Sequence, residues 1–451
     1  MSKTGEHSAA ADSSHNLMPD TSAQLMARRK ALLPAGLGVF NPATVTSARG
    51  SRMTDAEGRS LIDFAGGIGV LNAGHCPPPV VLAIQEQAAK LIHSCFNVAT
   101  YDLYMDLAED LIDLFPHGDH TKVMLTNSGA EAVENAIKVA RQATGRAAVI
   151  CFEGAFHGRS MMAMSLTSKV GYKLGCGPFA PEVYRIPFPD YYHGGAGLSL
   201  DDFVAGHEQH LLHVFKALVP ATEVAAIIIE PVQGEGGFNV VPQRYLKFLR
   251  QICDEYGIIL ILDEVQSGFG RTGKGAAYEH YDLVPDLSTW AKSLGSGMPI
   301  GCLMGRADIM DKARPSTIGG TYLGNPVCCA AALATLAYMR EIDINARGQH
   351  VGDIVRARFD NFKSRFPAIG DVRGLGAMMA FELVKNSDPN QPDEVLCKSI
   401  MSYAFEHGLV LINAGIYNNV IRVLSPLTIS DEDLNEGLDI IEAALVHHSK
   451  L

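Results

Sequence analysis

The chain has 451 residues, which is enough for a large hydrophobic core and about two domains. Hydrophobic residues make up 47% of it and charged residues 19%, a composition that excludes disordered and coiled-coil proteins. The formal net charge of −12 argues against nucleic acid or an anionic membrane as the main partner. No apolar run approaches the ~18 residues that a membrane span requires.

Residues 1–24 are rich in Ser, Ala and Asp and lack the apolar core of a signal peptide, so we expect a flexible tail on a cytoplasmic protein. The nine cysteines contain no C-x-x-C pair, which favours reduced thiols over a disulfide framework or a zinc site. His207, His210 and His213 miss the H-E-x-x-H register, because residue 211 is Leu. They indicate a polar helix face, and we expect no metal site.

Residues 75–335 alternate amphipathic helices with short apolar runs. Continuous apolar runs of this length are typical of strands that are buried on both faces of a mostly parallel sheet. In such a sheet ligands bind beyond the carboxyl ends of the strands. The clearest runs are 122–125, 147–152, 224–229 and 258–262, and each is followed by residue types that bind ligands or take part in catalysis. The pattern therefore predicts an α/β fold with one site along this edge.

The two flanks of this region have a different pattern. Residues 25–74 carry short strand and turn signals, and residues 336–451 alternate helices with glycine-punctuated strands such as 374–383. We predict that the flanks fold together into a smaller α+β domain beside a large domain of residues 75–335.

An aspartate and a lysine form the most informative pair in the chain. Asp263 directly follows the apolar run 258–262, and Lys292 follows another short β-prone stretch. Either residue alone has an ordinary explanation, since an aspartate after a strand often caps a helix. Together they provide what a pyridoxal phosphate enzyme needs, an amine that bonds to the cofactor aldehyde and a carboxylate that keeps the pyridine nitrogen protonated. At about 4 Å and an effective dielectric constant near 20, such a charge pair is worth roughly 4 kcal/mol.

Several segments, in this order along the chain, resemble the class III aminotransferases over about residues 25–445. They are NSGAEAVE at 127–134, FHGR at 156–159, EPVQGEGG at 230–237, DEVQ at 263–266, AKS at 291–293 and GTYLGNP at 320–326. Three further segments resemble in particular the members of that family that act on 4-aminobutyrate. They are DFAGGIGVLN at 63–72, GDVRGLGA at 370–377 and RVLSPLT at 422–428.

The resemblance implies the type I fold of pyridoxal phosphate-dependent transferases, with pyridoxal 5′-phosphate as the cofactor. Lys292 would carry the cofactor, and Asp263 would hold its ring nitrogen protonated. Ser128, Gly129 and Ala130 would bind its phosphate with backbone N–H groups at the start of a helix. The other implied cofactor contacts are Phe156 and Val265 on the two faces of the ring, His157, Gln266 at the phenolic oxygen, and Thr321 at the phosphate of a neighbouring subunit.

The resemblance also implies a substrate class. Arg159 resembles the residue that binds the distal carboxylate of an ω-amino acid, and Arg422 the one that binds the α-carboxylate of glutamate or 2-oxoglutarate. Arginine suits both roles because its guanidinium pairs with a carboxylate through two hydrogen bonds. Glu235 resembles a switch that pairs with Arg422 when the ω-amino acid, which lacks an α-carboxylate, is bound. Ile68 would line the apolar part of the pocket.

These expectations lead to the hypothesis that the protein moves the amino group of 4-aminobutyrate to 2-oxoglutarate, as a homodimer or a dimer of dimers. The same fold also supports a 5-aminovalerate or related ω-amine transaminase, and racemases, epimerases, mutases or decarboxylases. Arg159, Arg422 and Glu235 together favour transamination with a glutamate half-reaction. A nicotinamide-dependent dehydrogenase is disfavoured, because no G-x-G-x-x-G follows an early strand. One methylene is worth only about 1–3 kcal/mol of discrimination, so the sequence does not rank 4-aminobutyrate against its homologues.

Overall fold

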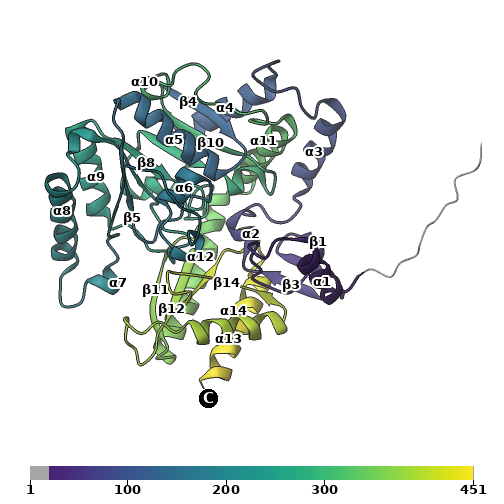
Figure 1. Ribbon diagram of the computed structural model, residues 1–451. Helices are drawn as coiled ribbons and strands as arrows, with labels where there is room; N and C mark the ends of the chain where they lie inside the picture. Colours follow the sequence, from purple (N-terminus) through teal and green to yellow (C-terminus); the bar gives the residue numbers. More distant parts are fainter. Residues whose placement is uncertain (1–19, 450–451) are drawn as a thin grey trace, which may run out of the picture.

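The computed structural model describes residues 20–449 and contains three β-sheets with helices around them (Figure 1). No helix within this range is long and apolar enough to cross a membrane. Most of the predicted tail, residues 1–19, lies outside the described residues. The first helix, α1 (Ser22–Leu32), begins inside the range predicted for the tail, because Thr21 caps it by accepting a hydrogen bond from the backbone N–H of Gln24.

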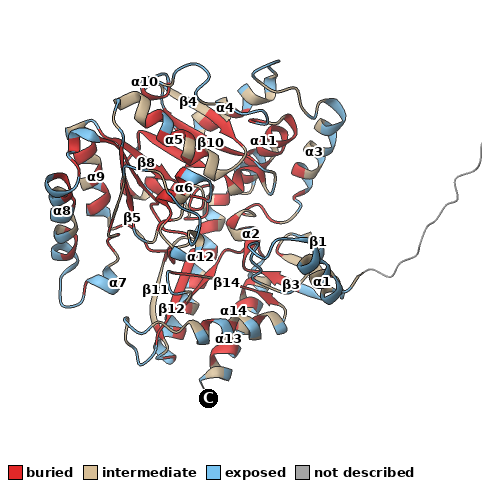
Figure 2. Cartoon of the chain, viewed as in Figure 1, coloured by how far each residue is buried: buried red, intermediate tan, exposed pale blue. Residues whose placement is uncertain are grey.

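The largest sheet has seven strands and is parallel except for one of them. In spatial order its strands are β4 (Thr121–Thr126), β10 (Gly301–Arg306), β9 (Leu287–Trp290), β8 (Ile259–Asp263), β7 (Val224–Ile229), β5 (Ala148–Phe152) and β6 (Val183–Ile186). Only β10 runs antiparallel to its neighbours. Every residue of β5, β7 and β8 is buried (Figure 2). The predicted mostly parallel sheet is therefore confirmed, and the four predicted apolar runs are four of its strands.

Helices cover both faces of this sheet, and each central strand divides its side chains between the two faces. In β7, Ala226 and Ile228 pack on one side, whereas Ile227 and Ile229 pack on the other. A strand covered twice has no polar face, which explains its continuous apolar sequence. The first face carries α5 (Gly129–Thr144), α6 (Met161–Leu166) and α10 (Ala307–Met310), and the second carries α8 (Leu200–Ala217) and α9 (Gln243–Tyr256).

Two smaller sheets lie in the flanks of the chain, and the first and last segments meet in one of them. One has the order β1 (Val45–Arg49), β2 (Arg52–Asp55), β3 (Ser60–Asp63) and β13 (Leu409–Val410), and the other β11 (Ile369–Leu375), β12 (Met378–Leu383), β15 (Val420–Val423) and β14 (Ile412–Ala414). β13 pairs in parallel with β3, with Leu409 opposite Ile62. We therefore propose that residues 25–74 and 336–451 belong to one smaller domain.

Helices link the smaller sheets to the large one. α12 (Ile344–Arg365) is the long helix near the centre of Figure 1, and it packs on β11 and β12. The domain boundary predicted at residue 335 falls inside α11 (Pro326–Glu341), which packs against two helices of the large part. The remaining helices are α2 (Gly66–Gly69), α3 (Pro78–Lys90), α4 (Asp102–Leu114), α7 (Tyr191–Gly194), α13 (Glu394–Glu406) and α14 (Asp431–His448). α11 packs on α3 and α4.

The strand predicted at 374–383 is instead a hairpin formed by β11 and β12. The chain reverses at Gly376, whose φ of +49° lies in the left-handed region that favours glycine. The backbone of Thr272 also approaches so closely that a Cβ atom at Gly376 would have no room. The residues on both sides of the turn are apolar, so hydrophobicity alone does not reveal the reversal.

Arg271 is a fully buried arginine that ties the large sheet to both flanks of the chain. Its Nε donates to Asn72 Oδ1 at 3.2 Å, and its Nη2 donates to the Ser425 carbonyl at 2.9 Å. Asn72 in turn donates to the Phe269 carbonyl at 2.9 Å. Burial lowers the pKa of Arg271 to about 9, although the charge of Asp63 opposes this effect. The buried guanidinium therefore depends on these few hydrogen-bond acceptors to compensate for its lost hydration.

Replacing Asn72 should destabilise the protein, because Arg271 would lose its side-chain acceptor while remaining buried. We expect Asn72→Ala to lower the free energy of unfolding by about 2–3 kcal/mol, measured by urea unfolding followed by circular dichroism. The control is Asn390→Ala, which removes a hydrogen bond to Asp388 in an exposed loop. Equal losses in the two variants would contradict this role of Arg271.

Candidate active site

A cavity of about 360 Å³ lies beyond the carboxyl ends of the parallel strands, at the edge of the sheet where ligands bind in this class of fold. Ten of the residues predicted for the site line it: Ser128, Gly129, Ala130, Phe156, His157, Glu235, Asp263, Val265, Gln266 and Lys292. They come from the end of β8 and from the segments that follow β4, β5, β7, β8 and β9. Four other predicted residues, Ile68, Arg159, Thr321 and Arg422, are not among the lining residues.

Lys292 begins a short 3-10 segment directly after β9. Its φ of +49° lies in the left-handed region, which side-chain-bearing residues seldom adopt and which is often found at functional sites. Burial lowers the pKa of Lys292 to about 8, while the nearby charge of Glu235 works in the opposite direction. A substantial share of the amine is therefore neutral close to physiological pH, as a nucleophile or base requires.

Asp263 is the last residue of β8 and is almost completely buried. One carboxylate oxygen accepts a hydrogen bond from the backbone N–H of Val265 at 3.1 Å, and the other lies 2.7 Å from Nδ1 of His157. With the carboxylate ionised, the histidine donates from Nδ1, which orients the aspartate in the cavity. His157 was predicted only as a cofactor contact, and its partnership with Asp263 was not foreseen.

Backbone groups and glycines form a narrow cradle at one end of the cavity. Ser128 caps α5, with its Oγ accepting from the backbone N–H of Glu131 at 3.3 Å. A Cβ atom on Gly129 would lie 2.9 Å from both methyl groups of Val265, and one on Gly158 would lie 2.7 Å from Cβ of Ala130. Glycine is thus required for the helix start to lie this close to the loops around it. The free N–H groups and the dipole of a helix start suit a phosphate.

Gln266 supplies unsatisfied polar atoms at the cavity wall. Its side chain is buried, yet neither Oε1 nor Nε2 has a hydrogen-bond partner among the described residues. Buried amides are normally paired, so this arrangement indicates a ligand that completes the bonding. Together with Lys292, Asp263 and the cradle at Ser128, it fits pyridoxal 5′-phosphate.

A buried ion pair borders the cavity on the side of the smaller sheets. Arg422 on β15 is fully buried, and its Nη1 lies 2.7 Å from Oε1 of Glu235. Burial raises the pKa of Glu235, but the charge and hydrogen bond of Arg422, together with the charges of Lys292 and Lys169, outweigh it, so the pKa is lowered overall. Nε and Nη2 of Arg422 have no partner among the described residues. The guanidinium therefore retains donors that a second carboxylate can use.

The other predicted residues do not line the cavity. Ile68 has a φ of +66° in the loop of α2, whose start is held by Asp63 Oδ1 accepting from two backbone N–H groups at 2.8 Å. Arg159 is exposed, with its guanidinium 5.3 Å from the centre of the Tyr172 ring. Thr321 is also exposed and has no contact with this cavity.

Glu230 is a cavity residue that the sequence analysis did not assign. Its Oε1 accepts from the backbone N–H of Phe156 and its Oε2 from that of Gly234, both at 2.9 Å. Burial is the main reason that its pKa rises to about 7. One carboxylate thus holds two loops of the site together. Its position directly after a buried strand was the available signal.

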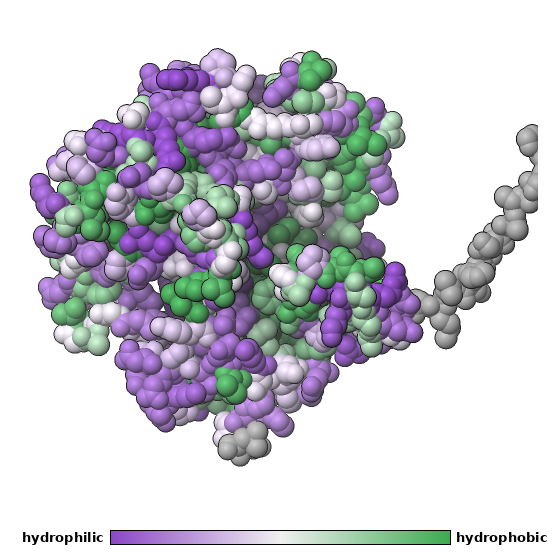
Figure 3. Space-filling view, viewed as in Figure 1, coloured by the Kyte–Doolittle hydropathy of each residue, from purple (hydrophilic) through white to green (hydrophobic). Residues whose placement is uncertain are grey.

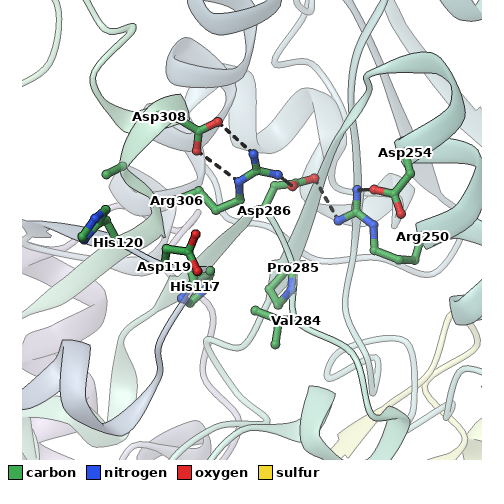
Figure 4. A pocket seen from close by; sticks show the side chains of 12 residues that line it. His117, Asp119, His120, Arg250, Asp254, Val284, Pro285, Asp286, Arg306 and Asp308 are labelled. Atoms are coloured by element: carbon green, nitrogen blue, oxygen red, sulfur yellow. Dashed lines mark hydrogen bonds and ion pairs between the residues drawn. The ribbon is translucent and has the colours of Figure 1, made fainter.

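A second cavity, of about 520 Å³, lies at the opposite edge of the sheet (Figure 4). Five of its charged side chains pair with one another, since Arg306 and Arg250 both bind Asp286, at 3.2 and 2.9 Å. Arg306 also binds Asp308 at 2.8 Å, and Arg250 also binds Asp254 at 2.7 Å. These pairs satisfy the charges in place, and the arrangement is that of a structural ion network.

Known proteins share this architecture. The family model for aminotransferase class-III matches residues 37–445. A probable 4-aminobutyrate aminotransferase of Bacillus subtilis is 49% identical over 385 residues, covering 85% of this chain and 88% of that protein. A 5-aminovalerate aminotransferase of Pseudomonas aeruginosa is 48% identical over 381 residues, covering 84% and 88%.

A solved structure extends the similarity to the fold. The ornithine aminotransferase of Toxoplasma gondii, whose active site is partly occupied by pyridoxal phosphate, superposes with a TM-score of 0.84 at 28% identity, covering 96% of each chain. The predicted type I fold and cofactor are thereby confirmed. The chain is a pyridoxal phosphate-dependent aminotransferase and belongs to aminotransferase class III.

Proposed function

We propose that the protein transfers the amino group of an ω-amino acid to 2-oxoglutarate, giving glutamate and a semialdehyde. The first candidate donor is 4-aminobutyrate, and the second is 5-aminovalerate, because relatives named for each are 49% and 48% identical to this chain. The observation that carries the proposal is the 2.7 Å pair of Glu235 and Arg422 at the edge of the cavity. A racemase-type reaction on one amino acid offers no use for such a pair.

The pair makes sense for an enzyme with two different substrates. Leaving a buried guanidinium without a partner is costly, so Arg422 needs a carboxylate at all times. When the donor lacks an α-carboxylate, Glu235 supplies the charge. When glutamate or 2-oxoglutarate binds, the α-carboxylate of the substrate would replace Glu235. Arg159 would bind the distal carboxylate that both substrates share.

Pyridoxal phosphate, when bound, supplies an electron-withdrawing ring that stabilises negative charge on the substrate carbon. Lys292 Nζ, with its pKa lowered to about 8, would accept the proton from the substrate carbon that carries the amine and deliver it to C4′ of the cofactor, and it would move a proton the opposite way in the second half-reaction. Asp263 would hold a proton on the ring nitrogen, oriented by its contact with His157. The helix start at Ser128 would hold the phosphate, and Gln266 the phenolic oxygen.

We also propose a homodimer, or a dimer of such dimers, in a reducing compartment such as the cytoplasm. Exposed apolar side chains lie on α3 and the nearby loops, and they include Leu82, Ile92, Val98 and Tyr322. Hydrophobic side chains also gather at the upper right of Figure 3, where α3 lies in the same view of Figure 1. Thr321 belongs to the same loop as Tyr322 and could reach the site of a partner subunit. Apolar patches of this kind often mark protein interfaces, and all nine cysteines are unpaired.

The first test concerns the amine of Lys292 in the cofactor-free protein. Because burial lowers its pKa, the neutral form should dominate above pH about 8, whereas an ordinary lysine reaches that point near ~10.4. The rate of acetylation of Lys292, read by peptide mass spectrometry against a model peptide, should rise with pH and level off above about 8. A rate that keeps rising to pH ~10 would contradict the lowered pKa.

The second test separates the two arginines and decides the function. Arg422→Ala should weaken the single-turnover reaction with 2-oxoglutarate by about 30- to 5,000-fold, the equivalent of losing a charged partner worth ~2–5 kcal/mol. The reaction with 4-aminobutyrate should be largely preserved. Arg159→Ala should impair both half-reactions.

The control for the second test is the double variant Glu235→Gln/Arg422→Met, which avoids leaving Glu235 as a lone buried charge. Like Arg422→Ala, it should lose the reaction with 2-oxoglutarate and largely keep the reaction with 4-aminobutyrate. Equal damage to both half-reactions by Arg422→Ala, or no effect of Arg159→Ala, would mean that the proposed substrates are wrong.

The third test addresses the dimer. Val98→Asp places a charge on the proposed interface, and we expect sedimentation to show monomers with little transaminase activity. Val395 is also apolar and 71% exposed but lies on α13, and Val395→Asp should remain an active dimer. A Val98→Asp monomer with full activity would refute the proposal that the site is shared between subunits.

A further inference from the structure

Tyr172 contacts residues of both proposed carboxylate sites. It ends the 3-10 segment Val170–Tyr172, and its hydroxyl donates to Oε2 of Glu235 at 3.3 Å. The guanidinium of Arg159 lies over its ring, 5.3 Å from the centre. The ring also meets Phe156 edge-on at 5.2 Å. A single side chain therefore connects Glu235, the exposed Arg159 and an aromatic residue of the cavity.

We propose that Tyr172 is a positioning residue that lets one site accept both monocarboxylate and dicarboxylate substrates. Its hydroxyl holds the Glu235 carboxylate after the substrate's α-carboxylate has taken Arg422. Its ring holds Arg159 in place for the distal carboxylate. The inference rests on the proposed function and assigns a role to a residue outside the set predicted from the sequence.

The need for such a holder follows from the two oxygens of Glu235. Oε1 binds Arg422 and Oε2 binds Tyr172, so the carboxylate is shared between the two donors. Only 15% of the Glu235 side chain is exposed. When Arg422 turns to the substrate, Glu235 keeps its charge in a poorly solvated place, where an unpaired carboxylate is costly. The Tyr172 hydroxyl is then the hydrogen-bond donor already in contact with it.

Lys169 does not replace Tyr172 in this role. Its Nζ donates to the Gly415 carbonyl at 3.0 Å and to Asn418 Oδ1, so two of its three donors are directed at the turn 415–418. The backbone N–H of Gly415 in turn donates to the Glu235 carbonyl at 3.0 Å. One turn thus holds the backbone of Glu235 and the side chain of Lys169, which lie on the two sides of the Tyr172–Glu235 contact. The Glu235 side chain can rotate while its main chain stays in place.

The protonation of Tyr172 agrees with a donor role. Burial raises its pKa, the charge of Glu235 raises it further, and the charges of Arg422 and Arg159 only partly oppose the two. The phenol therefore keeps its proton over the whole range in which the enzyme would work. The ring face remains available for Arg159, a cation–π arrangement that does not depend on the hydroxyl.

These two functions of Tyr172 can be separated by two substitutions. Tyr172→Phe keeps the ring and removes the hydroxyl, whereas Tyr172→Leu removes both. The probes are glutarate, which has two carboxylates but no amine or carbonyl group, and pentanoate, which has one carboxylate. Their dissociation constants are measured by isothermal titration calorimetry on the cofactor-loaded enzyme, so no turnover is needed.

We expect Tyr172→Phe to weaken glutarate binding by about tenfold, as for the loss of one hydrogen bond to a charged group, and to change pentanoate binding by less than about twofold. Tyr172→Leu should weaken both ligands. In a Glu235→Gln background the effect of Tyr172→Phe on glutarate should fall below about twofold, because no displaced charge remains to be held.

The outcomes distinguish the inference from the function on which it rests. If the unmodified enzyme does not bind glutarate, the proposed function fails. If it binds glutarate and Tyr172→Phe leaves that affinity unchanged, or weakens both ligands equally, the inference about Tyr172 is overturned while the function stands. An undiminished effect in the Glu235→Gln background would also overturn it, because the hydroxyl would then act through another group.

Discussion

The burial of charged groups at the carboxyl edge of the large sheet is the constraint that organises this protein. Asp263, Glu230, Glu235, Arg422 and Lys292 all lie in or beside one cavity, where water is too scarce to solvate them separately. Each charge therefore needs a defined neighbour. The aspartate has a histidine, Glu230 has two backbone N–H groups, and Arg422 has Glu235. The loops that follow the strands are shaped by these requirements.

The smaller part of the molecule takes part in this network. Arg422 comes from β15, and the turn 415–418 next to it holds the backbone of Glu235 and the side chain of Lys169. The buried Arg271 fastens the loop of Asn72 and the carbonyl of Ser425 to the large sheet. The substrate side of the cavity is therefore built from contacts between segments that are far apart in the sequence. A shift of the smaller sheets against the large one would change substrate binding before it changed the cofactor cradle.

The sequence predicted well those parts that follow from local pattern. Strands buried on both faces, such as Val224–Ile229, are uniformly apolar, and the order of the motifs identified the family and the cofactor. The sequence did not reveal the features that depend on tertiary contacts. The reversal at Gly376 lies between two apolar strands, and the pairing of His157 with Asp263 joins residues 106 positions apart. Tyr172 carries no local signal, because a tyrosine in a short 3-10 turn is ordinary until its neighbours are known.

The parallel pairing of β3 with β13 has a consequence for how the protein is made. β3 leads into the loop of Ile68, and its partner strand begins only at Leu409. On the ribosome the large sheet can form while β3 is paired only with β2, because every strand of that sheet precedes residue 307. The N-terminal segment must wait with an open strand edge until nearly the whole chain has been synthesised. Substrate recognition is thus the last capability to appear during biosynthesis, and incomplete chains would carry a formed sheet without a working pocket.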